Sequence, residues 1–70
     1  MRHRYIRIFV RCLKLTRRQT ISEKGFLCES DDIAKEKFRN LLKRDSRIHE
    51  AVLIRVRGGR QEIAESIAYC

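Results

Sequence analysis

Hydrophobic and polar side chains alternate from Tyr5 to Leu15, and a similar alternation returns from Ile48 to Arg57. Successive side chains of a strand point to opposite faces of its sheet, so both stretches are predicted as β-strands. One face of each strand is aliphatic, and the other mixes arginines with aromatic or aliphatic residues. The aliphatic face consists of Ile6, Ile8, Val10, Val52, Ile54 and Val56. The mixed face consists of Tyr5, Arg7, Phe9, Arg11, Leu53, Arg55 and Arg57. We expect the aliphatic face to form the core.

The segment after the first strand predicts a second one. Residues 20–28 begin with a β-branched residue and end in Phe-Leu-Cys, a composition typical of strands. Gly25 falls inside this segment, and a glycine within a strand often marks a bulge or a tight bend. Paired with the first strand, it would form an antiparallel hairpin that carries Arg17 and Arg18 at its tip.

A helix is predicted from about Asp31 to Arg44. Ser30 can accept a hydrogen bond from a backbone N–H of the first turn, and the acids that follow suit the positive end of the helix dipole. Apolar residues then recur at helical spacing. They are Ile33, Ala34, Phe38, Leu41 and Leu42. We expect this stripe to pack on the sheet, with Phe38 in the contact.

Gly58 and Gly59 directly follow the Ile48 to Arg57 strand and can adopt the positive φ angles of a tight hairpin turn. The segment from Arg60 to Tyr69 is compatible with a strand or with an amphipathic helix. The strand is favoured, because the Gly-Gly turn is the more specific signal. Its register would place Arg55 opposite Glu62 and Ile54 opposite Ile63, with Ile63, Glu65 and Ile67 on one side.

These elements predict an α+β fold, a small two-layer ββαββ domain with one helix packed on a mainly antiparallel sheet. The 70 residues leave room for one such basic domain, spanning residues 1–70. No stretch approaches the roughly 20 apolar residues of a membrane span, so we expect no membrane association. The N-terminus lacks the apolar region of a secretion signal, and we expect a cytoplasmic protein.

Charge indicates the class of partner. The chain has 17 Lys and Arg against nine Asp and Glu, a net charge of +8, and twelve of the 17 are arginine. Arginine presents a planar fork of donors that suits phosphate and carboxylate groups. A solvated basic surface would show the same composition. The charge therefore favours an anionic partner without identifying it.

Sequence motifs give no support to catalysis or metal binding. Gly58-Gly59 stands alone, without the further glycines, lysine and hydroxyl of a phosphate-binding loop. Asp31 and Asp32 are explained by their place at the start of the predicted helix. His and Cys residues lack the local spacing of a zinc site; they are His3, Cys12, Cys28, His49 and Cys70. We expect a protein that is not an enzyme and uses no cofactor.

Two functions from different classes fit the predicted fold. In the first, the mixed face is open and binds nucleic acid, single strands above all, because aromatic rings stack on bases and arginines attract the backbone. The binding residues would be Tyr5, Arg7, Phe9, Arg11, Arg17, Arg18, Leu53, Arg55 and Arg57.

In the second, the same face binds protein. Exposed apolar residues such as Tyr5, Phe9 and Leu53 often mark a subunit or partner interface. The partner would be a second copy of the chain or an acidic protein surface. By size and charge alone, the chain is similar to small basic accessory proteins, such as those of bacteriophages, that bind and modulate a cellular factor. The nucleic-acid interpretation is slightly favoured.

Overall fold

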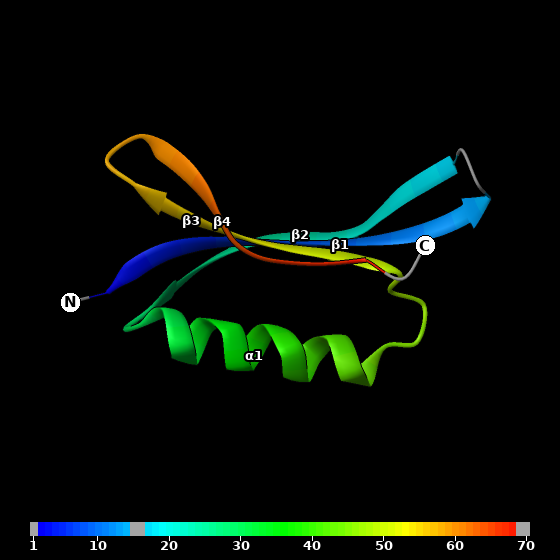
Figure 1. Cartoon of the computed structure of the whole chain (residues 1–70), viewed down its shortest axis with the longest axis horizontal. Helices are drawn as coiled ribbons and strands as arrows, with labels where there is room; N and C mark the ends of the chain where they lie inside the picture. The colour runs from blue at the N-terminus through cyan, green and yellow to red at the C-terminus, as the bar shows by residue number, and fades with distance from the viewer. Residues whose placement is uncertain (1, 15–16, 69–70) are drawn as a thin grey trace.

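The computed structural model describes residues 2–14 and 17–68 and contains four strands and one helix. In chain order they are β1 (His3–Lys14), β2 (Arg17–Cys28), α1 (Asp31–Arg44), β3 (Glu50–Arg57) and β4 (Arg60–Ala68). The strands form one sheet in the order β2-β1-β3-β4, with every neighbouring pair antiparallel. α1 lies along one face of this sheet (Figure 1). The predicted α+β class and the ββαββ order are confirmed.

α1 begins and ends at the predicted residues. Ser30 is its N-cap, and the Ser30 Oγ accepts a hydrogen bond from the backbone N–H of Ile33 at 3.3 Å. Asp31 and Asp32 occupy the first turn and basic residues the last, as the helix dipole favours. With 14 residues, the helix found in the described part of the chain is too short and too polar to cross a membrane.

The β3–β4 hairpin has the predicted turn and register. Gly58 and Gly59 have φ angles of +51° and +81°, which let two strands reverse without a longer loop. Arg55 pairs with Glu62 and Ile54 with Ile63. The segment from Arg60 is therefore a strand.

A bulge in β4 changes which residues share a face. The register shifts between Leu53 and Ile54, leaving Ala64 as the extra residue. Glu65 consequently faces α1 with Leu53, whereas Ile63 lies on the other side of the sheet with Ile54. The expectation that Ile63 and Glu65 share a side is wrong, because it assumed unbroken alternation.

The β1–β2 hairpin also has its bulge at an unpredicted residue. Gly25 pairs regularly with Ile6, and the register instead shifts at Ile21, between the pairs Phe9–Ser22 and Val10–Thr20. A further irregularity lies near the hairpin end, between Cys12 and Lys14. β2 therefore runs regularly from Ser22 to Cys28.

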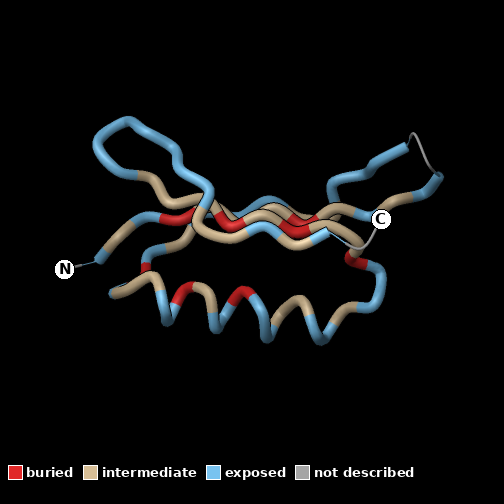
Figure 2. Tube along the Cα trace, viewed as in Figure 1, coloured by how far each residue is buried: buried red, intermediate tan, exposed pale blue. Residues whose placement is uncertain are grey.

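The core lies between the sheet and α1, where buried segments of the two layers face one another (Figure 2). Its buried members come from every layer of the described structure. They are Tyr5, Phe9, Cys28, Ala34, Phe38, Ile48, Ala51 and Leu53. The rings of Phe9 and Phe38 lie 5.9 Å apart, and those of Tyr5 and Phe26 stack at 5.6 Å. Phe38 is fully buried, so the prediction that the helix packs through it is confirmed.

Candidate functional site

The mixed face of the sheet is the face that α1 covers. Tyr5 and Leu53 have no exposed surface and Phe9 has 5%. These residues cannot stack on a base or meet a partner in this structure. The expectation that the aliphatic face is the core and the mixed face is open is wrong. The physical reason is area: the aromatic rings bury more apolar surface than the β-branched residues opposite them.

Arg55 lies beside this core and forms ion pairs there with two acidic side chains. The Tyr5 hydroxyl donates to Asp31 Oδ1, and Arg55 Nη1 donates to the other oxygen of the same carboxylate. Arg55 Nη2 also donates to Glu62 Oε2 at 3.3 Å. A partly buried charge is costly unless it is paired, so this network lets the arginine occupy the covered face.

The same network shifts two pKa values. Burial, together with the hydrogen bond to Asp31, raises the pKa of Tyr5 to about 12. The hydrogen bond from Tyr5 and the nearby Arg55 lower the pKa of Asp31. Both shifts keep the ordinary charge states at neutral pH. The pattern is that of a structural clamp between the start of α1 and the sheet.

The remaining predicted site residues separate into groups. Arg7 lies beside the core, with its guanidinium carbon 4.8 Å from the centre of the Phe9 ring. Arg11, Arg17 and Arg18 are exposed toward the end of the β1–β2 hairpin. Arg57 is exposed at the end of the β3–β4 hairpin, next to Gly58. The structure therefore does not bring the predicted residues together into one binding surface.

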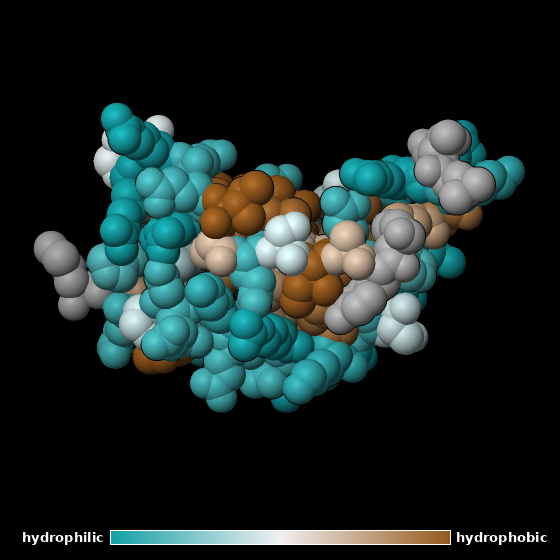
Figure 3. Space-filling view, in the orientation of Figure 1, coloured by the Kyte–Doolittle hydropathy of each residue, from teal (hydrophilic) through white to brown (hydrophobic). Residues whose placement is uncertain are grey.

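The uncovered face of the sheet is aliphatic instead. We call it the open face, and it consists of Ile6, Ile8, Val10, Val52, Ile54 and Val56, all half-buried, with Ile63 at its border. Ile63 is 68% exposed. Figure 3 shows a hydrophobic area on the side away from α1, between two raised hydrophilic ends. These ends are the β1–β2 and β3–β4 hairpins, which rise from the sheet at opposite ends (Figure 1).

Charged residues of the open face lie toward its border. Glu50 forms an ion pair with Arg18, with Glu50 Oε2 at 3.3 Å from Arg18 Nη1. Glu23 pairs with Ile8 from edge strand β2, and Arg4 pairs with Val56 at the end of the sheet. At the centre, the directly paired Ile8 and Val52 of the two inner strands are both aliphatic, and Glu23 lies beside Ile8 on the edge strand. The sequence did show this aliphatic set, but it did not show which face the helix would cover.

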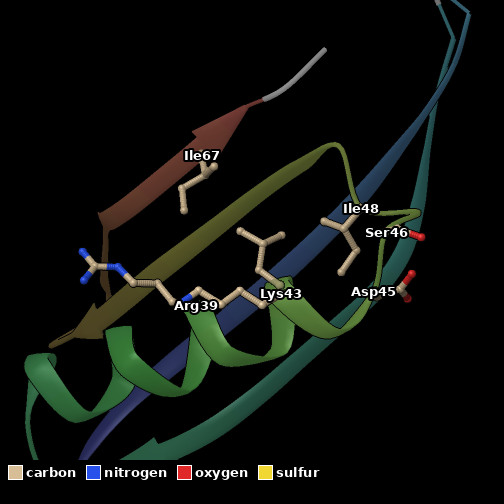
Figure 4. Close-up of a pocket in the computed structure, with 7 residues that line it drawn as sticks. Arg39, Lys43, Asp45, Ser46, Ile48 and Ile67 are labelled. Atoms are coloured by element: carbon tan, nitrogen blue, oxygen red, sulfur yellow. The ribbon is translucent and has the colours of Figure 1, made fainter.

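A cavity of about 380 Å³ opens between the C-terminal half of α1 and β4 (Figure 4). Leu42, Ile48 and Ile67 give it apolar walls. Its arginine, Arg39, donates from Nε to Glu65 Oε1 at 3.1 Å and ties the helix to the sheet. Lys43, Asp45 and Ser46 give the cavity its other polar walls.

Two of the histidine and cysteine residues, Cys12 and His49, lie next to each other in the described structure. His49 Nδ1 accepts a hydrogen bond from the backbone N–H of Cys12 at 3.0 Å, and the backbone N–H of His49 donates to the carbonyl oxygen of Val10 at 2.9 Å. Cys28 is buried in the core. Within residues 2–14 and 17–68, no three His, Cys, Asp or Glu residues could together hold a metal ion. Cys70 lies outside the described residues.

Comparison with known proteins adds no family. No protein-family model matches the chain, and no curated protein or solved structure matches it.

Proposed function

We propose that the protein is a non-enzymatic binding protein that self-associates through its open face and leaves its basic outer surface for an acidic partner. The observation that carries the proposal is the aliphatic sheet face, over which the described residues place no second layer. Contiguous apolar patches on a protein surface commonly mark interaction sites. Covering this face with a second sheet would give each copy the two-sided packing that a small domain lacks.

A second copy fits the open face by chemistry. Charged residues are depleted at the centres of protein interfaces, and the central Ile8 and Val52 are aliphatic. At the border, the Arg18 and Glu50 of one copy could exchange partners with those of another. A self-complementary patch of this kind is what a two-fold interface requires.

Shape supports the same pairing. A twisted sheet is saddle-shaped, and here the two hairpins form the raised corners (Figure 1). When a second copy is turned over about an axis along the strands, its raised corners come to lie over the lowered corners of the first. Two such sheets then pack with their strands nearly aligned, at the usual separation of about 10 Å.

The expected strength is modest. Burying the exposed remainder of one half-buried aliphatic side chain contributes about 0.5 kcal/mol, roughly a quarter of the value for full burial. The six half-buried residues of two copies would then contribute about 6 kcal/mol, and the more exposed Ile63 adds about 1 kcal/mol in each copy, before the costs of association are subtracted. We therefore expect a reversible, concentration-dependent dimer.

Salt separates this proposal from binding driven by charge. Each copy carries +8, so the two copies repel, and added salt screens that repulsion. The dimer should strengthen between low and high salt. Binding of the basic chain to nucleic acid should weaken, because salt opposes the release of counterions from the phosphates. Tyr5 and Phe9, the aromatic residues predicted to stack on bases, are buried, so their stacking does not support nucleic-acid binding.

Sedimentation velocity over a range of concentrations tests the proposal. The parent should shift from 8.4 kDa toward twice that mass as concentration and salt increase. The double variant Ile8→Lys/Val52→Glu should stay monomeric. These two residues pair directly across β1 and β3, so the substitution places opposite charges side by side and keeps the net charge at +8.

Ile33→Lys is the matched control, because Ile33 is an exposed isoleucine on α1, away from the open face. It should dimerise like the parent. Circular dichroism of all variants verifies that they are folded. A parent that remains monomeric at every concentration, or a folded double variant that still dimerises, would contradict the proposal.

A further inference from the structure

A continuous groove follows the seam between α1 and the edge strand β2. It consists of adjoining cavities of about 350, 200 and 590 Å³. The first two share Leu27 and Lys37, and the second and third share Arg7 and Leu41. The stretch of α1 along the seam, from Ile33 to Arg44, is about 17 Å long, the length of an extended segment of about five residues.

Basic residues line this groove, which we call the basic groove. Lys24 comes from β2, Lys37 and Arg44 come from α1, and Arg7 comes from β1. None of these four takes part in the ion pairs found within the described residues. The other flank of α1 differs, because there Arg39 is paired with Glu65.

The acids of the basic groove lie toward its ends. Glu29 lines the cavity beside the start of α1. Asp45 lines the opposite end and is already paired with Arg47 at 2.8 Å. The middle of the basic groove is therefore a stretch of uncompensated positive charge.

The interior of the basic groove is apolar but contains one unpaired donor. Phe26 and Leu41 line its middle cavity and pack partly against the core. The Nε of Arg7 is buried and has no hydrogen-bond partner in the described part of the chain. Buried donors are normally paired, so this atom favours an acceptor reaching the groove from outside.

The backbone of β2 is available along the same seam. β2 ends the sheet and pairs with β1 on one edge, and its other edge has no strand beside it among the described residues. From Ser22 to Cys28 the strand is regular, since the bulge lies at Ile21. An unpaired regular edge presents backbone N–H and C=O groups that can accept a further strand.

We propose that the basic groove binds an extended acidic segment of a partner protein, which adds to β2 as a fifth strand and directs its carboxylates to Lys24, Lys37 and Arg44. In a strand, alternate residues point the same way, so a segment with an acid at every second position would place all its acids on the groove. Nucleic acid could use the charge, but it lacks the alternating backbone donors and acceptors that β2 would pair with. The inference names the partner class of the proposed function and rests on it for the idea of an acidic partner.

The test uses a capped, fluorescein-labelled peptide of alternating Glu and Val, and measures its binding by fluorescence anisotropy. The parent should bind it, and Lys24→Glu/Lys37→Glu should weaken binding by roughly tenfold, as for the loss of two surface charge contacts. The control Lys35→Glu/Lys43→Glu makes the same change in net charge at residues of α1 that line cavities outside the groove. It should bind nearly as well as the parent.

The same peptide with N-methyl groups on alternate residues tests the strand pairing, because it keeps the carboxylates and loses backbone donors. Loss of binding on methylation supports addition to β2. Equal binding of the methylated peptide, or equal losses in the two charge variants, would overturn the proposal. If oligothymidine of equal charge binds the basic groove more tightly than the peptide and displaces it, the basic groove is a nucleic-acid site and the proposal is overturned.

The two proposals fail separately. The basic groove belongs to one copy, so the monomeric Ile8→Lys/Val52→Glu variant should still bind the peptide. Peptide binding without dimerisation would refute the open-face proposal alone. Dimerisation without peptide binding would refute the groove alone.

Discussion

The Tyr5 hydroxyl donates a hydrogen bond to the Asp31 carboxylate and so joins the middle of the sheet to the first turn of α1. Tyr5 is fully buried, and Asp31 is the first residue of the helix. Arg55 contacts the same carboxylate. One acid therefore satisfies a buried hydroxyl, pairs an arginine on the covered face, and suits the positive end of the helix dipole. This clamp holds the start of α1 against the covered face of the sheet.

We expect Tyr5 to make stability fall at alkaline pH. Its pKa is about 12 in the folded chain and 10.0 ordinarily, so the unfolded chain loses this proton first. The contribution of Tyr5 to the free energy of unfolding is fully present below pH 10. It decreases between pH 10 and 12, by up to roughly 3 kcal/mol. Urea unfolding of Tyr5→Phe across this range should show a shallower decline. The other tyrosine, Tyr69, is present in both chains. Parallel declines would show that Tyr5 titrates normally.

We expect Asp31 to make stability fall at acid pH. Its pKa is lowered from 3.8, so its contribution is present above pH 4 and is lost as the pH falls through the lowered folded value. Asp31→Asn should be less stable than the parent at neutral pH and should lose less on acidification. Asp32→Asn removes the same charge from the same helical turn and is the control. If both variants respond alike, the effect belongs to the helix dipole and not to the clamp.

Truncation of Phe38 should remove most of the stability of the domain. This side chain is fully buried against Phe9, and replacing such a residue by alanine costs about 3–5 kcal/mol. Denaturant unfolding of Phe38→Ala, at fixed protein concentration, measures the loss. Ile33→Ala is the control, because Ile33 is 39% exposed and should lose far less. Similar losses in the two variants would mean that α1 is rotated from its position in the structure.

The β3–β4 turn should depend on Gly59. Its φ of +81° is strained for any residue with a Cβ, and Gly59→Ala should cost about 1–2 kcal/mol. Gly25→Ala is the matched control within a strand, since a Cβ there would lie 3.7 Å from the backbone carbonyl oxygen of Tyr5, an ordinary contact. Thermal melts compare the two. A larger loss at Gly25 would show that the strand, and not the turn, restricts the backbone.

The sequence predicted the positions of the helix and strands far better than it predicted which face of the sheet the helix covers. Ser30, the acids after it and the stripe through Phe38 located α1, and Gly58-Gly59 located the last hairpin. These signals are local, because capping and turn chemistry depend on adjacent residues. The bulges at Ile21 and Ala64 had no such signal.

The choice of face depended on partners distant in the chain. Arginines beside Tyr5 and Phe9 argued for exposure, and only the fold shows that Asp31 and Glu62 pair with Arg55. The candidate site consequently changed from the mixed face to the aliphatic one. The size of the aromatic rings was the available hint, since large rings bury the most area.

Nuclear Overhauser effects between chains report whether the open faces of two copies meet. A mixed sample of isotope-labelled and unlabelled protein, at high concentration and salt, reports only contacts between copies. We expect effects among the methyl groups of Ile8, Val52 and Ile54, and none from the buried Leu53. A dimer whose contacts between chains arise from α1 or the outer edges, with none from the open face, would show that the open faces do not meet.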